Sequence, residues 1–120
     1  NAVAVSACEQ CGRNRVPSVT EIRSLDSAIT QGLAQGLTQG RRLAILHPAG
    51  GESLISWAAQ TPDAPLALLV GPEGGFTDQE IAQAVSLGAT KVTFGPRVLR
   101  TETAGLAALA ALQAVLGDLR

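Results

Sequence analysis

The chain has 120 residues, of which 46% are hydrophobic, 16% are charged and only 2% are aromatic. This length allows one compact domain, whose core must be built from Ala, Leu, Val and Ile. The formal net charge of -1 excludes a strongly basic surface, so any contact with nucleic acid must come from a local arginine cluster or from another domain.

The sequence has no run of about 18 apolar residues, which a membrane-spanning helix would need, and no secretory signal pattern. We therefore expect a cytoplasmic protein that contacts no membrane. Cys8 and Cys11 form a C-x-x-C pair, but a zinc site normally needs four ligands and only His47 could add another. We expect no metal and a structural or incidental role for this pair. Because the chain begins at Asn1 and contains no Met, we also expect it to be part of a longer protein.

The N-terminal third predicts two helices joined by a turn and a short strand. Ala2 to Gln10 is typical of a helix end, which Gly12 closes. Ser18 to Ile22 alternates loosely between polar and apolar residues, which favours a short strand. A second helix is expected to start at Ser24 or Asp26 and to run to about Gly36, because its apolar residues recur at helical spacing.

The rest of the chain alternates strands with helices. Apolar runs that end in Gly or Pro predict strands at Arg42–Leu46, Ala67–Val70 and Lys91–Phe94. Helical spacing predicts helices at Glu52–Gln60, Asp78–Leu87 and Thr103–Leu116. Trp57, in the first of these helices, is expected to be partly exposed. The alternation favours an α/β fold with a mainly parallel sheet flanked by helices.

The stretch from Leu68 to Phe76, LLVGPEGGF, is the segment around which we expect the functional site to form. It predicts a buried strand that ends in a tight loop, and its glycines let backbone N–H groups approach a ligand closely. Thr77 and Glu80 form a capping box, so the loop is expected to end at a helix start. Since ligands of open α/β sheets bind beyond the carboxyl ends of the strands, we expect this loop to hold a small cofactor.

Two other strand ends are expected at the same edge of the sheet, namely Leu46–Pro48 and the stretch from Phe94 to Ala104. Neither the G-x-G-x-x-G pattern nor a Gly-Lys-Ser/Thr sequence is present, so phosphate binding has little support. Aliphatic side chains combined with exposed backbone donors suit an adenine or a nucleoside better.

The final helix is apolar almost all round. From Ala104 to Leu116, Gln113 is the only polar side chain. A helix of this kind is buried on both sides, and in a chain this small one side must face the sheet. We expect the other side to form a homodimer, and the alternative is that another part of the same protein covers it.

Two motifs, GPEGGFTDQEI and FGPRVLRTETA, together resemble those of the SPOUT-class RNA methyltransferases. The chain is most similar to the RsmE type, the bacterial uridine N3-methyltransferases of 16S ribosomal RNA. That family has an EQ-x-x-R…VP segment, which CEQCGRNRVP resembles, and LQAVLGD is similar to its ending. Gly95-Pro96-Arg97 and Val98 stand where the family often has Leu-Gly-x-Arg-Ile, a mild departure that leaves the glycine and both arginines in place.

The resemblance covers nearly the whole chain and implies a SPOUT fold, an α/β domain with a C-terminal trefoil knot, which is an exception to the rule that chains avoid knots. It implies S-adenosyl-L-methionine bound in the knot, a homodimer with the active site near the subunit interface, and 16S ribosomal RNA as substrate, either free or in the assembled small subunit. The family also carries an N-terminal PUA-like RNA-binding domain. We therefore expect residues 1–120 to be the methyltransferase domain alone, inactive on RNA by itself.

The resemblance and the chemistry of the reaction indicate the site residues. Uridine N3 must lose its proton before it attacks, and Arg100, or as second candidate Arg97, would stabilise the resulting anion. Glu73 or Glu102 could accept the proton or orient an arginine, and Arg13 and Arg15 are expected to contact RNA phosphates. The residues expected to bind the cofactor are Leu46, His47, Val70, Gly71, Pro72, Glu73, Gly74, Gly75, Phe94, Gly95, Val98, Leu99, Arg100, Thr103 and Ala104.

Other interpretations stay open at this point. Glu102 and Thr103 could simply cap the last helix, and Arg100 could form a structural ion pair with Glu102 or Glu73. His47 is expected to be a wall of the cofactor pocket rather than a base. The alternative functions are a SPOUT methyltransferase that acts on transfer RNA, and a nucleoside-binding module without turnover.

Overall fold

Four parallel strands form the sheet, in the order β2-β4-β1-β3. The computed structural model describes residues 2–49, 51–95, 99–117 and 119. Its strands are β1 (Arg42–Leu46), β2 (Glu52–Ser53), β3 (Leu66–Leu69) and β4 (Thr90–Thr93). The predicted strand at 42–46 is confirmed residue for residue, and the other two predicted strands each lie one residue earlier than expected. The parallel pairing confirms the predicted class of sheet.

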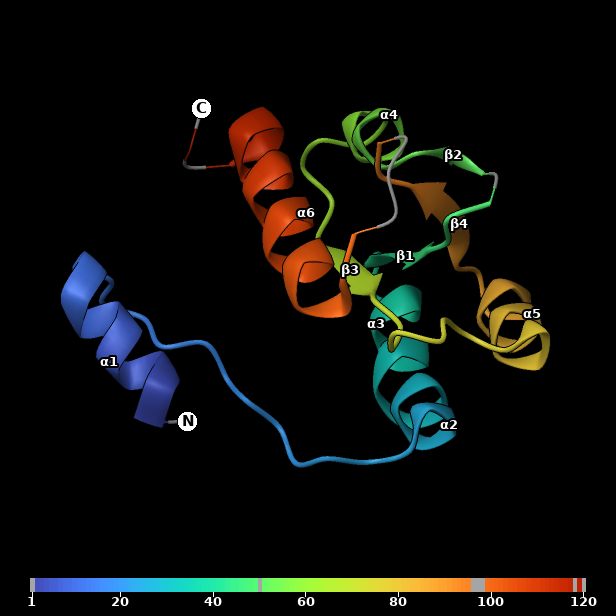
Figure 1. The fold of residues 1–120 in the computed structure, drawn as a ribbon, viewed down its shortest axis with the longest axis horizontal. Coiled ribbons are helices and arrows are strands. Elements are labelled where there is room, and N and C mark those ends of the chain that lie inside the picture. Colours follow the sequence, from blue (N-terminus) through green and yellow to red (C-terminus); the bar gives the residue numbers. More distant parts are fainter. Residues whose placement is uncertain (1, 50, 96–98, 118, 120) are drawn as a thin grey trace.

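Helices cover both faces of this sheet (Figure 1). They are α1 (Ala2–Cys11), α2 (Leu25–Ser27), the π-helical η1 (Ala28–Leu33), α3 (Ala34–Thr38), α4 (Leu54–Ala59), α5 (Asp78–Ser86) and α6 (Thr101–Leu116). The segments α2, η1 and α3 follow one another without a break, so the predicted second helix is confirmed and extends two residues beyond Gly36. Its start is capped by Ser24, whose hydroxyl accepts the N–H of Ser27.

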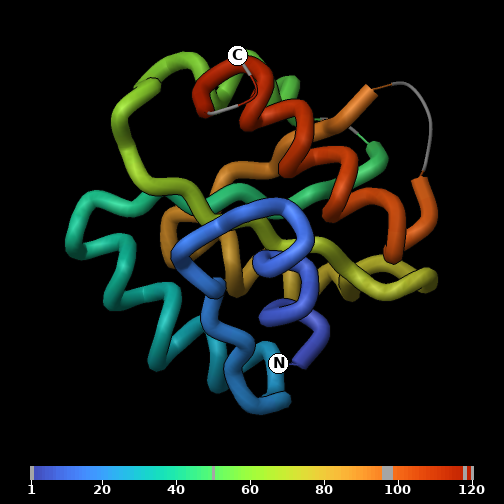
Figure 2. The backbone as a smooth tube through the Cα atoms, turned by 90° about the vertical axis from the view of Figure 1, so that its left-hand side faces the viewer, coloured from blue at the N-terminus to red at the C-terminus, as the bar shows by residue number. Residues whose placement is uncertain are grey.

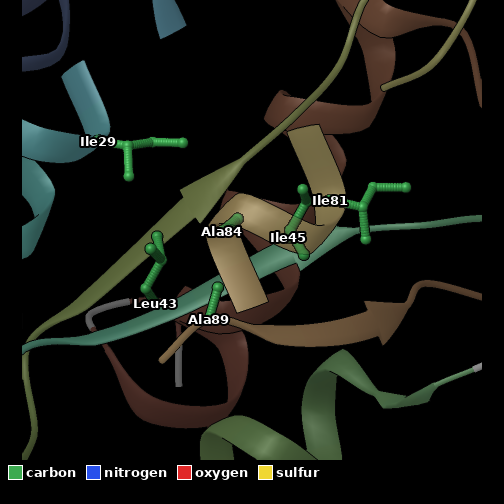
Figure 3. Close-up of a cluster of buried hydrophobic side chains, with 6 residues drawn as sticks. All are labelled: Ile29, Leu43, Ile45, Ile81, Ala84 and Ala89. Carbon is green, nitrogen blue, oxygen red and sulfur yellow. The ribbon is translucent and has the colours of Figure 1, made fainter. Parts of the chain in front are cut away.

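The hydrophobic core is divided into two clusters by the sheet. Successive side chains of a strand point to opposite faces, so Leu43 and Ile45 of β1 enter one cluster while Ala44 enters the other. The first cluster joins the sheet to η1 and α5 and contains Ile29, Leu43, Ile45, Ile81, Ala84 and Ala89 (Figure 3). The second joins the sheet to α4 and α6 and contains Ala44, Leu54, Trp57, Ala58, Val92 and Ala108.

The N-terminal part departs most from the sequence-based expectations. The predicted helix is present as α1, but residues 18–22 form no strand. They belong to an extended, exposed segment that connects α1 to α2, and α1 stands apart from the sheet (Figure 1), so that it lies in front of the rest of the chain in Figure 2. A strand needs a hydrogen-bonded neighbour, and all the strand pairs that the structure describes lie between residues 42 and 93.

Three further details correct the sequence analysis. The helix expected at 52–60 begins only at Leu54, because Glu52 and Ser53 pair with β4 as strand β2. Trp57, expected to be partly exposed, is buried, with 2% of its surface accessible. The final helix begins at Thr101 rather than Thr103. The predicted capping box of Thr77 and Glu80 is confirmed at the start of α5.

The connection from β4 to α6 runs through residues 96–98, which lie outside the described residues. The trefoil knot implied by the resemblance therefore stays a prediction. Within the described ranges, no helix combines the length and the apolar character that crossing a membrane requires.

Candidate functional site

A cavity of about 440 Å³ lies at the carboxyl ends of β1, β3 and β4. Its size is within the usual range for small-molecule sites. The register explains its position, because Ile45 of β1 lies beside both Leu69 of β3 and Lys91 of β4, so the three strands end at the same edge. The lining residues come from the loops after these strands and from the start of α6: Leu46, His47, Pro48, Ala49, Val70, Gly71, Pro72, Glu73, Gly74, Gly75, Phe76, Thr93, Phe94, Gly95, Leu99, Thr101 and Ala104.

The loop after β3 makes a tight turn at the mouth of this cavity. The N–H of Gly75 donates to the carbonyl of Pro72 at 2.8 Å. Gly75 has a φ of 77°, a conformation that costs a residue with a side chain about 1–2 kcal/mol. The sequence G-P-E-G-G therefore places its backbone groups along the cavity and leaves room for a ligand to approach them.

Phe76 packs against the first glycine of the same loop. A Cβ atom built on Gly71 would lie 3.1 Å from Cδ2 and Cε2 of the Phe76 ring, which is closer than most carbon contacts in proteins. Any larger residue at this position would require the Phe76 ring to shift by a few tenths of an ångström. The ring of Phe76, at the end of the loop after β3, thus packs against Gly71 near the start of the same loop.

Thr101 joins this loop to the start of α6. Its hydroxyl donates a hydrogen bond of 2.9 Å to the carbonyl of Gly71, 30 residues away in the sequence. The two loops that the sequence motifs indicated are therefore in direct contact. Thr101 itself was not predicted, although it belongs to the RTETA part of the second motif, and a hydroxyl at a helix start was a usable signal.

The structure brings most of the predicted cofactor-binding residues together. Twelve of them line the cavity: Leu46, His47, Val70, Gly71, Pro72, Glu73, Gly74, Gly75, Phe94, Gly95, Leu99 and Ala104. Arg100 and Thr103 are not among the lining residues, and Val98 lies outside the described residues. Five lining residues were not predicted to bind the cofactor, although Pro48, Phe76 and Thr101 belong to the strand-end stretches that were expected at this edge; the five are Pro48, Ala49, Phe76, Thr93 and Thr101.

Of the predicted catalytic residues, only Glu73 is among the lining residues that the structure describes. Glu73 lines the cavity and is exposed to solvent. Arg100 is the residue just before α6, lies between two lining residues in the sequence, and is exposed. Glu102 lies in the first turn of α6 and is also exposed. Arg97 lies outside the described residues. The catalytic roles of these residues therefore stay predictions.

The two arginines predicted to contact RNA lie near the N-terminus, just after α1. Arg13 and Arg15 are both exposed, and each is held by a bond of its backbone. The N–H of Arg13 donates to the carbonyl of Cys8 at 2.9 Å, and the Cys8 thiol lies 3.8 Å from the carbonyl of Arg15. Both residues are exposed to solvent, as a phosphate contact would require.

The character of the cavity limits what it can hold. The lining residues that the structure describes include one carboxylate, Glu73, and one imidazole, His47, but no lysine or arginine. Nδ1 of His47 lies 3.2 Å from the N–H of Ala49, a contact within the loop after β1. Among the described residues, no three His, Cys, Asp or Glu side chains are grouped closely enough to hold a metal ion. An uncharged or cationic ligand with an apolar part fits this lining better than a phosphate.

Comparisons with known proteins place these features in a family. An RNA methyltransferase domain family matches residues 1–113. Ribosomal RNA small subunit methyltransferase E of Mycobacterium bovis is 37% identical over 111 residues, which cover 92% of this chain and 42% of that protein.

Two solved structures are similar over nearly the whole chain. One is the ribosomal RNA small subunit methyltransferase E of Neisseria gonorrhoeae bound to S-adenosyl methionine, with 39% identity and a TM-score of 0.86 over 99% of this chain and 47% of that one. The other is a putative methyltransferase of Legionella pneumophila in complex with the cofactor SAM, with 40% identity and a TM-score of 0.82 over 98% of this chain and 45% of that one. This chain thus spans less than half the length of these relatives.

Proposed function

The chain belongs to the RNA methyltransferase domain family that matches residues 1–113, and from this premise we propose that it transfers a methyl group from S-adenosylmethionine to N3 of a uridine in 16S ribosomal RNA. The observation that carries the proposal is the cavity built by the three strand-end loops and the start of α6. The relatives from M. bovis and N. gonorrhoeae, which carry the name of small-subunit ribosomal RNA methyltransferases, support the choice of RNA. Such an enzyme works in the cytoplasm, where bacterial ribosomes are assembled.

The lining of the cavity fits S-adenosylmethionine. Leu46, Val70 and Leu99 offer apolar surface to an adenine ring, and the loop of residues 71–75 offers backbone groups to its polar edges. Glu73 is the one carboxylate among the described lining residues, and it suits a ligand that carries a sulfonium and an ammonium group. The N. gonorrhoeae and L. pneumophila structures, both bound to this cofactor, match the chain over nearly its full length.

The cofactor supplies an activated methyl group when it is bound. The protein must then position the uridine in line with this group and lower the cost of removing the N3 proton. In the proposed mechanism, the guanidinium of Arg100 stabilises the negative charge that develops on the base, because Arg100 lies between the lining residues Leu99 and Thr101. Glu73 or Glu102 accepts the proton or orients Arg100.

Calorimetric titration of this chain with S-adenosylmethionine tests the central claim. We expect saturable binding with one site per chain. A folded chain that bound no cofactor would contradict the proposal at its base. Gly71→Leu is the matched negative variant, because the added side chain would collide with Phe76 and enter the cavity.

The proposed role of Arg100 has its own test. In the whole protein, Arg100→Ala should lower the rate of methyl transfer by on the order of 100-fold, the usual effect of removing one group that stabilises a developing anion. Cofactor affinity should stay near normal. Arg23→Ala, which removes an exposed arginine from the segment before α2, is the control. Equal losses of cofactor affinity and rate would instead assign Arg100 to binding or folding.

We further propose that Arg13 and Arg15 contact RNA phosphates. Each phosphate contact contributes about one unit to the dependence of log affinity on log salt concentration. The double variant Arg13→Ala/Arg15→Ala should therefore weaken RNA binding and reduce this slope by about 2. Lys91→Ala, an exposed cation on β4, serves as the control. An unchanged slope in the double variant would exclude these contacts.

Finally, we propose a homodimer formed through α6. One side of this helix packs against α4 and the sheet through Ala108, Leu112 and Leu116, while Leu106 is 73% exposed and Leu109 is 56% exposed. Light scattering should give the mass of a dimer at micromolar concentration. Leu106→Glu should shift it to a monomer, and Val3→Glu, which charges an exposed apolar residue of α1, should not. A monomeric unmodified chain would contradict the proposal.

A further inference from the structure

One side-chain hydrogen bond joins two loops of the cavity. The hydroxyl of Thr101, at the first residue of α6, donates to the carbonyl of Gly71, just beyond β3, at 2.9 Å. Both residues line the cavity, and the bond is partly shielded from solvent. Partial shielding strengthens such a bond relative to one in open water. The bond therefore holds the loop after β3 against the start of α6 at a point where both line the cavity.

Phe76 contacts Gly71 from within the same loop. The ring of Phe76 lies so close to Gly71 that a Cβ atom there would come within 3.1 Å of it. Phe76 also packs against the cluster of Ile45 and Ile81. The carbonyl of Gly71 thus belongs to a loop that Phe76 supports, and Thr101 connects that loop to the first turn of a 16-residue helix.

We propose that Thr101 is a positioning residue for the cofactor: its hydroxyl holds the loop after β3 against the start of α6 and keeps the cavity in the form that binds. This inference rests on the proposed function. When only a fraction of molecules has the binding form, the apparent dissociation constant rises in inverse proportion to that fraction. Loss of one hydrogen bond of ordinary net strength corresponds to a decrease of up to about tenfold in that fraction.

The test compares Thr101→Val, which keeps the shape of the side chain but removes the donor, with Thr101→Ser, which keeps the donor. Calorimetry should give S-adenosylmethionine binding that is weaker by up to about tenfold for the valine variant and nearly unchanged for the serine variant. The control is Thr38→Val, which removes a similar bond to the carbonyl of Gln35 at a site outside the cavity. The carbonyl ¹³C signal of Gly71 reports the bond itself, and it should shift in Thr101→Val alone.

Each outcome has a separate meaning. Unchanged cofactor affinity in Thr101→Val, or equal losses in the valine and serine variants, would overturn the positioning role while the proposed function stood. A Gly71 carbonyl signal that did not move in Thr101→Val would overturn it too. If the unmodified chain bound no cofactor, the proposed function would be wrong. The role of Thr101 in cofactor binding would then be wrong too, whatever the carbonyl signal showed.

Discussion

The guanidinium of Arg42 lies 4.3 Å from the centre of the Trp57 ring. Nη1 of the same arginine donates a hydrogen bond of 2.6 Å to the Trp57 carbonyl, and Nη2 lies 3.4 Å from Oε1 of Gln60. Gln60 in turn donates to Glu52 of β2 at 2.8 Å. A single side chain at the start of β1 thus stacks on one residue of α4 and ties the end of that helix to the sheet.

Replacing this arginine should destabilise the fold. Arg42→Ala removes the stacking and a charged hydrogen bond to a partly buried carbonyl, so we expect a loss of about 2–3 kcal/mol in the free energy of unfolding. Arg42→Lys should lose less, because it keeps the charge but not the planar donor group. Trp57 is the only tryptophan, so its fluorescence reports urea unfolding directly. Arg23→Ala should change stability by less than about 0.5 kcal/mol, and an equal effect in both alanine variants would exclude a specific role for Arg42.

The loop after β3 offers a comparison of two adjacent glycines. Gly75→Ala forces a side chain into a left-handed conformation and should cost about 1–2 kcal/mol of unfolding free energy. Gly74→Ala should cost less than about 0.5 kcal/mol, because its backbone is not left-handed and a Cβ atom there would meet no other atom within 4 Å. Urea unfolding of the two variants measures the difference. Equal stabilities would show that the loop relaxes around either alanine.

The inner side of α6 should not tolerate a larger residue. Ala108 is fully buried in the cluster beneath α4, so Ala108→Leu would overpack it and should cost about 1–3 kcal/mol. Ala82→Leu makes the same change on the exposed side of α5 and should be nearly neutral. Thermal unfolding followed by circular dichroism distinguishes these outcomes. A neutral Ala108→Leu variant would mean that α6 packs more loosely than the structure describes.

The capping box at the start of α5 should contribute measurably to stability. The Thr77 hydroxyl accepts the N–H of Glu80 at 3.1 Å, and the Glu80 carboxylate accepts the N–H of Thr77 at 2.8 Å. Thr77→Ala should therefore lower the free energy of unfolding by about 1 kcal/mol. Thr77→Ser keeps the accepting oxygen and should restore most of the loss in the same urea titration. A serine variant as unstable as the alanine variant would argue against capping.

The sequence predicts elements well where the signal is local. Strand β1 was predicted residue for residue because a continuous apolar run is bounded by charged residues before it and by His47-Pro48 after it. The start of α5 was predicted because both partners of its capping box lie within four residues. Most of the cavity was also predicted, since parallel strands that end in Gly or Pro converge on one edge.

What the sequence did not predict depends on partners far along the chain. Glu52 and Ser53 have no strand pattern of their own, and their extended conformation comes from pairing with Val92 and Thr93. Trp57 is buried because it packs with Val92 of β4 and Ala108 of α6, and Arg42 of β1 stacks on its ring. Thr101 contacts Gly71 across 30 residues, a relationship that no local spacing reveals.

The order of the strands has a consequence for how the chain is made. During synthesis, β1 can pair with β3 as soon as residue 69 has left the ribosome, but β4 must then enter between β1 and β2. Strand β2 pairs with β4 within the described sheet, so it waits until residues 90–93 are available. Pairings between distant segments form slowly, and the apolar edge of β1 is exposed in the meantime. The last third of the sequence therefore closes the sheet, and a nascent chain that stalls before β4 would present an open strand edge to chaperones or to aggregation.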